Sequence, residues 1–587
     1  MEIELRPGTP AAFSQSTVCG AFQATLAAAG DRVALRTKGD GVRITWSELG
    51  ERVKRYAGGF VAQGVRPGDA IAMLLSNRPE FNVLDAAALH VGAVPFSIYV
   101  TSTVEQIRYF LEDSGAKLAI TERAFAAKLR EAAPQLATIV VDESLAELET
   151  QPAGFDFEAA WRAVTPDSLL TIIYTSGTTG MPKGVELTHA NIVAQLRCFQ
   201  AVREIEAGAR IISYLPHAHV ADRMSTHYMN MFVGGTVTTC PDPRQLFEHV
   251  PDVKPTEFTG VPRVWEKLKA GLEAKFAAEP VEKRAAIQGA IEASLVKVRA
   301  EQAGQPVPES LAHGVARAEQ MVFAPLRAAL GLDQARAFFV GAAPTPREVL
   351  EFFHALHIPI AEVWGMSELS CVATAMPKGV YKIGSVGKAL PGVELRLADD
   401  GEVLVRGSLV MRGYRNKPEQ TRETIVDGWL HTGDVGELDA DGFLKLVDRK
   451  KELIINAAGK NMSPANIEAR IKTSSPLIGQ ACVIGDGRAY NVALVVLDPD
   501  GAMAFCKAKQ LDLPLAKLVA HPDVTAEIER AIAAANQHLS RVEQVKRIAL
   551  LADEWLPGGD ELTPTMKLKR KPIAAKYASR IEALYAE

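Results

Sequence analysis

The sequence predicts an α/β protein with a large N-terminal domain of stacked α/β layers and a β-rich lobe, followed by a small C-terminal α+β domain. Short apolar runs alternate with helical stretches along the first two thirds of the chain. Alternating hydrophobicity and Asp-Gly turns follow after about Gly392, and a charged segment at 448–452 opens a smaller unit. The 587 residues, 48% of them hydrophobic, are too many for one compact core and too apolar for a chain that is mainly disordered.

The predicted strands of the large domain are short apolar runs between helical stretches. They lie at 70–75, 117–121, 169–174, 337–340 and 358–363. Runs of this kind indicate parallel strands that are buried on both faces. The longest apolar stretch, 83–100, carries Asp85 and His90, with Gly92 and Pro95 in its second half. It predicts a buried helix followed by a strand and not a membrane span.

Two later regions differ from this alternation. Residues 266–332 are rich in Ala, Glu, Lys and Arg with apolar positions at helical spacing, which predicts a helical excursion with a packing role. Residues 393–405 read as a hairpin, and a second hairpin turns at 439–442, where the glycine comes too early for an EF-hand loop. We expect an N-terminal domain over 1–448 and a C-terminal domain over 449–587.

Composition excludes several functional classes. Lys plus Arg total 65 and Asp plus Glu total 70, so no basic surplus points to nucleic acid. The six cysteines form no CxxC pair, which argues against a disulfide scaffold or a structural zinc site and favours a reducing compartment. The N-terminus shows no signal peptide. We therefore expect a cytoplasmic protein, with peripheral membrane contact left open and the oligomeric state undetermined.

A segment at 174–184 follows the predicted strand at 169–174 and has the composition of a phosphate-binding loop. Three glycines free the backbone to curl around an anion, four hydroxyls supply donors and one lysine supplies charge. The alternative is a Gly/Thr-rich surface turn. A Walker A loop is excluded because no Gly-Lys-Ser/Thr ends the segment. The candidate phosphate-binding residues are Thr175, Ser176, Gly177, Thr178, Thr179, Gly180 and Lys183.

This segment resembles the phosphate loop of the adenylate-forming superfamily, which includes acyl-CoA synthetases, luciferases and nonribosomal peptide adenylation domains. Further motifs of that superfamily follow in the same order as far as Lys571, so the resemblance covers most of the chain. The motifs at 214–223 and 260–267 are most similar to those of bacterial long-chain fatty acid–CoA ligases. The resemblance implies a large adenylate-forming domain and a small, mobile C-terminal domain.

Two motifs bear on the acid that would be activated. By resemblance, His219 in the motif at 214–223 would lie near the carboxylate; the competing idea is a metal site formed by His217, His219 and His227. Trp265 in the motif at 260–267 would gate a fatty-acyl tunnel, or it is simply a core aromatic residue. Residues 229–233 are expected to wall the channel.

Other motifs bear on the nucleotide. The turn Gly341, Ala342, Ala343 and Pro344 resembles the adenine-binding turn, where small residues let a flat base approach the backbone. The segment Trp364, Gly365, Met366, Ser367 and Glu368 resembles the motif that contacts the base and the α-phosphate. The superfamily usually has Tyr and Thr where this chain has Trp364 and Ser367. Glu368 would bind Mg²⁺, a cation that prefers oxygen ligands.

The remaining motifs concern the ribose, the hinge and the catalytic lysine. Asp434 would accept hydrogen bonds from both ribose hydroxyls, and Arg449 would reach the ribose or a phosphate. Lys451 falls at the hinge position. The C-terminal motif at 561–571 places the catalytic lysine at Lys567, but Met566 replaces the usual glycine, so Lys569 remains a rival.

The resemblance implies ATP-dependent activation of a long-chain fatty acid to acyl-AMP, followed by transfer to coenzyme A with release of AMP and pyrophosphate. Lys183, His219, Glu368 and Lys567 would form the catalytic set, with ATP, Mg²⁺ and CoA as cofactors or co-substrates. Two alternatives remain at this stage. One is a fatty acyl-AMP ligase that passes its product to a carrier protein, and the other is a catalytically silent binding protein on the same fold.

Overall fold

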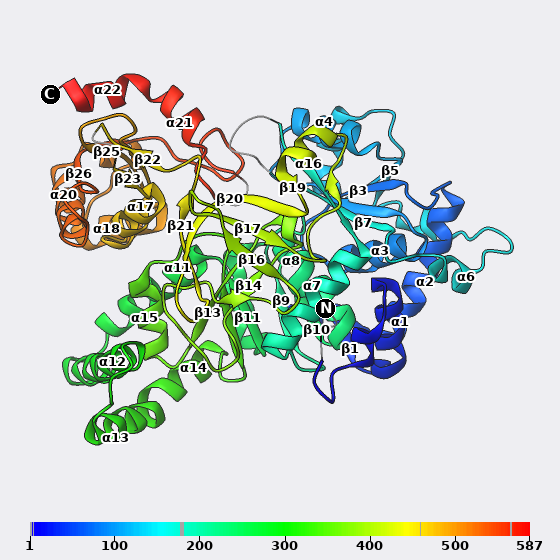
Figure 1. The fold of residues 1–587 in the computed structure, drawn as a ribbon, viewed down its shortest axis with the longest axis horizontal. Helices are drawn as coiled ribbons and strands as arrows, with labels where there is room; N and C mark the ends of the chain where they lie inside the picture. The colour runs from blue at the N-terminus through cyan, green and yellow to red at the C-terminus, as the bar shows by residue number, and fades with distance from the viewer. Residues whose placement is uncertain (1–2, 4, 176–180, 458–459, 564–565, 587) are drawn as a thin grey trace.

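The computed structural model describes residues 3, 5–175, 181–457, 460–563 and 566–586. Figure 1 shows a large N-terminal part that holds most of the sheets and a smaller C-terminal part at one edge. Among the described residues, no helix combines the length and the apolarity needed to cross a bilayer.

The first sheet is parallel throughout and has the order β4-β3-β5-β6. Its strands are β3 (Ala70–Leu74), β4 (Val94–Ser97), β5 (Leu118–Thr121) and β6 (Thr138–Val140). Ile71 and Met73 face a core shared with helices α2 (Trp46–Ala62) and α3 (Pro79–His90), whereas Ala72 and Leu74 face a core shared with α4 (Val104–Ser114) and α5 (Arg123–Ala132). Both faces are buried, as a parallel sheet requires. The stretch 83–100 forms the end of α3 and then β4, which confirms the prediction of a helix followed by a strand.

Two further sheets continue the α/β layers. One has the order β2-β1-β10-β9 and the other has the order β11-β12-β13-β14-β15. The short strands of these sheets are β2 (Arg43–Thr45), β14 (Thr374–Ala375) and β15 (Lys388–Ala389). Their main strands are β1 (Val33–Thr37), β9 (Arg210–Ser213), β10 (Thr236–Thr239), β11 (Glu257–Gly260), β12 (Ala337–Val340) and β13 (Ile360–Trp364). The runs predicted at 337–340 and 358–363 thus become β12 and β13, which are parallel neighbours. Helices α1 (Val18–Ala29), α7 (His189–Arg203), α10 (Leu246–Val253) and α15 (Arg347–Ala355) belong to these layers.

The run at 169–174 departs from the prediction of a parallel strand. It forms β7 (Leu169–Thr175), which pairs antiparallel with β8 (Lys183–Thr188) in a separate sheet of order β18-β8-β7. Strand β18 is the short segment Gly413–Tyr414. Burial of both faces made β7 resemble a parallel strand, but the partner of a strand is set by distant packing. The antiparallel pairing places Thr175 opposite Lys183.

Residues 262–330 are helical except for short connections, in agreement with the expected excursion. They form α11 (Pro262–Ala277), α12 (Val281–Gln302), α13 (Glu309–Ala318), a π-helical turn (Glu319–Phe323) and α14 (Ala324–Leu330). Leu268, Leu272 and Phe276 on one face of α11 are buried in a core that also contains Trp265.

The β-rich lobe contains the two predicted hairpins. Strands β16 (Glu394–Leu397) and β17 (Glu402–Arg406) form the first, and β20 (Trp429–Leu438) and β21 (Leu444–Arg449) form the second. Strand β19 (Ile425–Val426) and helix α16 (Pro418–Thr424) complete the lobe. The boundary between 448 and 449 stays a prediction; it falls at the end of β21.

The C-terminal part has its own apolar core and an α+β arrangement. Strands β24 (Ile478–Ile484) and β25 (Asn491–Leu497) are antiparallel, and β26 (Val545–Leu551) adds to β25 in parallel. The main helices are α17 (Pro464–Thr473), α18 (Pro499–Lys509), α20 (Pro522–Gln537), α21 (Arg570–Lys576) and α22 (Ala578–Ala586). These elements lie together at the upper left of Figure 1.

Candidate active site

The pairing of β7 with β8 brings the two flanks of the candidate phosphate loop together. Thr175 Oγ1 donates a hydrogen bond of 3.4 Å to the Lys183 carbonyl oxygen, and the Lys183 ammonium lies 4.5 Å from the ring centroid of Tyr414. Ser176, Gly177, Thr178, Thr179 and Gly180 lie outside the described residues. The described flanks therefore place the positively charged Lys183 next to this segment.

Glu368 follows β13 in a short 3₁₀ turn (Ser367–Leu369) and is only 7% exposed. The Tyr414 hydroxyl donates a hydrogen bond of 2.8 Å to its Oε1 atom. Burial and the neighbouring Glu368 carboxylate raise the pKa of Tyr414, so this phenol stays protonated and remains a donor. The backbone carbonyl of Glu368 also accepts a hydrogen bond of 2.8 Å from the Met411 N–H. Glu368 is thus fixed through its side chain and its backbone.

Asp434 joins three predicted nucleotide-site residues. Its Oδ1 atom lies 2.8 Å from Arg449 Nε across the β20–β21 pair, and its Oδ2 atom accepts a hydrogen bond of 2.8 Å from the Trp364 indole N–H. Burial opposes the charge on Arg449, but Asp434 and nearby carboxylates outweigh it and raise the pKa of the guanidinium. The Trp364 edge therefore holds the carboxylate, which is a role that sequence reasoning did not assign to it.

The residues expected around the base lie at the ends of neighbouring parallel strands. Gly341, Ala342, Ala343 and Pro344 follow β12, and the last three of them are exposed. Ala342 has a φ of 73°, a left-handed conformation that is rare for residues with a side chain. Gly365 packs so closely on Cys371 that an added Cβ would lie 1.8 Å from the Cys371 carbonyl oxygen. Met366 and Ser367 complete this segment, and Ser367 is buried.

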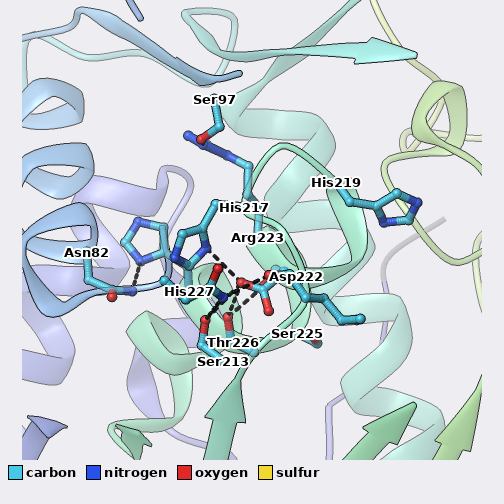
Figure 2. Close-up of polar contacts among 12 residues, drawn as sticks. Asn82, Ser97, Ser213, His217, His219, Asp222, Arg223, Ser225, Thr226 and His227 are labelled. Carbon is cyan, nitrogen blue, oxygen red and sulfur yellow. Dashed lines mark hydrogen bonds and ion pairs between the residues drawn. The ribbon is translucent and has the colours of Figure 1, made fainter. Parts of the chain in front are cut away.

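His219 points away from His217 and His227, whose rings lie near each other, and the three histidines do not form a metal site (Figure 2). The ring of His217 stacks on Phe81 with centroids 3.6 Å apart, and its Nδ1 atom lies 2.7 Å from Asp222. His227 Nε2 lies 2.9 Å from Asp85 Oδ1. Across the part of the chain that the structure describes, no group of His, Cys, Asp and Glu could hold a metal ion by itself.

His219 occupies the N-cap of α8 (Val220–Asp222). Its Nδ1 atom accepts a hydrogen bond of 3.1 Å from the Ala221 N–H, so the proton of the neutral ring sits on Nε2. Burial, assisted by the charge of Lys567 and opposed by Asp222, lowers the pKa of His219 to about 4. His219 is therefore neutral at physiological pH and offers an N–H donor.

Trp265 is fully buried in the core of the helical excursion. Its indole N–H donates a hydrogen bond of 3.3 Å to the Phe339 carbonyl oxygen, and its ring packs edge-on against Phe258 and Phe353. This is the packing of a core aromatic residue, and the gating role stays a prediction. Helix α9 (Met229–Val233), the expected channel wall, is also buried, with Phe232 against Phe13.

The C-terminal motif brings Lys567 toward the same carboxylates. Lys567 is exposed to solvent. Enclosure by surrounding protein nevertheless lowers the pKa of its ammonium group, and Arg449 lowers it further, while Asp434, Glu452 and Glu368 act in the opposite direction. Lys569, by contrast, donates a hydrogen bond of 2.7 Å to the Gly559 carbonyl oxygen within the C-terminal part. The Lys569 ammonium is thus bonded within the C-terminal part, and the assignment of Lys567 as the catalytic lysine stays a prediction.

Comparisons with known proteins agree with this arrangement. Residues 22–415 match the AMP-binding enzyme family, and residues 451–587 match the C-terminal domain of AMP-binding enzymes. The chain belongs to the AMP-binding enzyme family. The predicted superfamily and fold class are thereby confirmed.

Two curated relatives of this AMP-binding enzyme are mycobacterial. A Mycobacterium tuberculosis protein named for fatty-acid–CoA ligase activity, fadD11, is 52% identical over 76% of this chain and 78% of its own length. The long-chain-fatty-acid–CoA ligase FadD15 of Mycobacterium bovis is 36% identical over 92% of both chains. The o-succinylbenzoate CoA synthetase MenE of Bacillus subtilis has the same fold, with a TM-score of 0.69, 24% identity and coverage of 94% of this chain and 97% of MenE.

The structure of this AMP-binding enzyme also shows contacts that sequence reasoning missed. A buried polar cluster under the motif at 214–223 joins Asp85, Arg223, His227 and Asn82, with Asp85 bonded to both Arg223 and His227 (Figure 2 draws part of it). Tyr414 contacts two predicted site residues although it belongs to none of the motifs considered. Only the charged character of Asp85 within an apolar stretch could have signalled the buried cluster.

Proposed function

We propose that this AMP-binding enzyme is a long-chain fatty acid–CoA ligase that forms acyl-AMP and then an acyl-CoA thioester, with release of pyrophosphate and AMP. The observation that carries the proposal is the meeting of Trp364, Asp434 and Arg449, which come from three separate motifs, in one hydrogen-bonded and ion-paired group. The names of FadD11 and FadD15 support the fatty-acid substrate and the CoA acceptor.

In the first half-reaction the fatty-acid carboxylate attacks the α-phosphorus of ATP, and pyrophosphate leaves. No protein nucleophile is required, so the residues act by binding and by neutralising charge. Lys183 and the hydroxyls of 175–179 hold the β- and γ-phosphates, and Lys567 faces the α-phosphate and the attacking carboxylate. Ser367 donates a hydrogen bond to the α-phosphate.

The nucleoside binds at the ends of β12 and β13 and beside Asp434 in the middle of β20. The exposed turn Gly341, Ala342, Ala343 and Pro344 receives the adenine next to Gly365 and Met366. Asp434 accepts the ribose hydroxyls, while Trp364 and Arg449 hold its carboxylate in place. This assignment draws support from the one hydrogen bond of 2.8 Å and the ion pair of 2.8 Å that fix the Asp434 carboxylate.

Glu368 is the residue that would hold Mg²⁺. It fits a hard cation because it is a buried carboxylate with one oxygen taken by Tyr414 and the other left for a ligand. One protein carboxylate together with ATP phosphates is a usual way of holding this ion. When bound, Mg²⁺ supplies charge neutralisation on the phosphates.

His219 is assigned to the acid. Because its ring is neutral with the proton on Nε2, it donates a hydrogen bond to a carboxylate oxygen and adds no positive charge that would trap the attacking group. The acyl chain then extends past Trp265 and α9, where the side chains around it are buried and apolar. Competition among acids of increasing chain length tests this placement, and a preference for acetate or benzoate contradicts it.

In the second half-reaction the CoA thiol attacks acyl-AMP. The proposed domains are 1–448 and 449–587, and rotation of the small domain at Lys451 withdraws Lys567 and opens a path for the thiol. We place the enzyme in the cytoplasm, with peripheral membrane contact when it meets lipid substrates.

The deciding experiment combines ATP, Mg²⁺ and a mixture of fatty acids, with and without CoA, and measures nucleotides and acyl products. AMP with acyl-CoA, formed only when CoA is present, is the expected result. Acyl-AMP that accumulates despite CoA supports the fatty acyl-AMP ligase with a carrier-protein acceptor. Formation of ADP contradicts adenylation, and ATP binding without turnover of any acid supports the silent binding protein.

A further inference from the structure

Tyr414 connects two residues of the proposed ATP site that come from different sheets. Its hydroxyl donates a hydrogen bond of 2.8 Å to Glu368 Oε1, and its ring centroid lies 4.5 Å from the Lys183 ammonium. Tyr414 is 8% exposed. One side chain therefore touches both the proposed Mg²⁺ ligand and the phosphate-loop lysine.

The position of Tyr414 is fixed from several sides. Its strand β18 pairs with β8, with Tyr414 opposite Val185. The Tyr414 N–H donates a hydrogen bond of 2.9 Å to Thr421 Oγ1 in α16, and the next residue, Arg415, donates its N–H at 2.7 Å to the Gly184 carbonyl oxygen. These bonds fix the backbone of Tyr414, and its burial and the hydrogen bond to Glu368 fix the ring.

The chemistry of the two contacts is complementary. A buried carboxylate beside a lysine ordinarily forms a direct ion pair, which would occupy both charges. Here the ring attracts the Lys183 ammonium through a cation–π contact, and the hydroxyl occupies one oxygen of Glu368. Among the described residues, neither the second carboxylate oxygen of Glu368 nor the Lys183 ammonium forms a hydrogen bond or ion pair, so both are available to a ligand.

We propose that Tyr414 is a positioning residue of the ATP site, whose hydroxyl orients Glu368 toward a divalent cation and whose ring holds the Lys183 ammonium beside the phosphates. This inference rests on the proposed function, because it takes Glu368 as the ligand of Mg²⁺. It predicts that the hydroxyl and the ring affect two separable steps, namely the use of Mg²⁺ and the binding of the phosphates themselves.

The test measures ATP affinity by calorimetry over a range of Mg²⁺ concentrations, without fatty acid. For Tyr414→Phe we expect the Mg²⁺ concentration for half-maximal tightening of ATP to rise about tenfold, the size of one lost hydrogen bond to a charged group, while the Mg²⁺-free affinity changes less than about twofold. Tyr414→Leu also removes the ring, so the Mg²⁺-free affinity falls as well.

The matched control is Tyr490→Phe, because the Tyr490 hydroxyl bonds to the Leu584 carbonyl within the C-terminal domain. Its Mg²⁺ dependence should equal that of the unchanged protein. Thermal unfolding of each variant shows that it is folded. Thr421→Val keeps the phenol but loosens its backbone anchor, so it should shift the Mg²⁺ dependence in the same direction by about two- to threefold.

Glu368→Gln separates the two levels of the proposal. If it raises the Mg²⁺ requirement and Tyr414→Phe does not, Glu368 is the metal ligand but the role of Tyr414 is wrong. If Glu368→Gln leaves the Mg²⁺ dependence unchanged, the metal assignment and the inference that rests on it both fall. When both roles hold, the Mg²⁺ requirement of the double variant Tyr414→Phe/Glu368→Gln equals that of Glu368→Gln alone.

Discussion

Arg263 of α11 forms an ion pair with Asp498, the residue that caps α18 in the C-terminal domain. Two further contacts join the same surfaces: Lys267 lies 2.8 Å from Asp500, and Thr473 Oγ1 donates a hydrogen bond of 2.7 Å to Glu348. Arg263 and Asp498 are the more buried pair, with side chains 29% and 12% exposed. These contacts join the C-terminal domain to α11 and α15 of the large domain, and the proposed role of Lys567 depends on that position.

Loss of the Arg263 contact should therefore slow acyl-AMP formation. A partly buried ion pair contributes about 1 kcal/mol, so Arg263→Ala is expected to reduce the rate about fivefold while thioester formation from supplied acyl-AMP is unchanged. Lys267→Ala, from a more exposed pair, is the control and should change the rate less than twofold. In a double-mutant cycle, Asp498→Asn keeps a capping side chain, and additive effects would contradict direct coupling.

Replacement of the catalytic lysine should separate the two half-reactions. Lys567→Ala is expected to reduce acyl-AMP formation about 100-fold or more, because a charge that neutralises the reacting anions is lost, and to spare thioester formation from supplied acyl-AMP. Lys569→Ala should retain adenylation, since its ammonium is bonded to Gly559. Pyrophosphate release and acyl-CoA formation are measured separately, and normal adenylation by Lys567→Ala would show that the assignment is wrong.

The Trp364 indole should tune the recognition of ribose. Trp364→Phe keeps an aromatic ring but removes the N–H that bonds to Asp434, so KM for ATP should rise about tenfold while KM for the fatty acid stays the same. Discrimination between ATP and its 2′- or 3′-deoxy analogues should shrink, because Asp434 loses its fixed orientation. An unchanged preference for ATP over both analogues would contradict this role.

Glu257 should make the free energy of unfolding fall as pH rises. Burial at the start of β11 raises the pKa of Glu257 to about 8, with Arg203 opposing the shift. The folded state therefore binds more protons than the unfolded state between the ordinary carboxyl pKa and 8, and the contribution to stability is lost as pH rises through that window. The slope is on the order of 1 kcal/mol per pH unit.

Urea unfolding at pH 5, 6.5 and 8 tests this directly. Glu257→Gln removes the titrating group, so the difference in unfolding free energy between the unchanged protein and the variant should shrink or reverse as pH rises. Glu282→Gln, which replaces an exposed carboxylate, is the control and should follow the unchanged protein at every pH. Parallel curves for Glu257→Gln and the unchanged protein would place the Glu257 pKa in the ordinary range.

The proposed hinge at Lys451 predicts the opposite defect to the lysine variant. The described backbone hydrogen bonds include none donated by the Lys451 N–H, so proline would remove none of them. Lys451→Pro should stiffen the connection and slow CoA-dependent turnover about tenfold or more while acyl-AMP still forms. Accumulated acyl-AMP, measured after rapid quenching, is the expected signature; unchanged turnover would contradict a hinge at this residue.

The sequence by itself determined the α/β class, the helix and strand within 83–100, the helical excursion, both hairpins and the order of the family motifs. These features are local. The spacing of apolar residues indicates which positions are buried, and pairs such as Asp-Gly indicate where the chain turns. The candidate site residues Lys183, Glu368, Asp434, Arg449 and Lys567 were also predicted from their motifs.

Tertiary structure decided which of these residues meet. The antiparallel pairing of β7, the bond from Trp364 to Asp434, the contact of Tyr414 with Glu368 and the bond from Lys569 to Gly559 all join residues on separate elements or on different strands. A buried strand has the same apolar pattern whichever neighbour it pairs with, and a donor's partner depends on packing across the whole domain. Such pairings are fixed only when distant parts of the chain pack together into the cores of the folded protein.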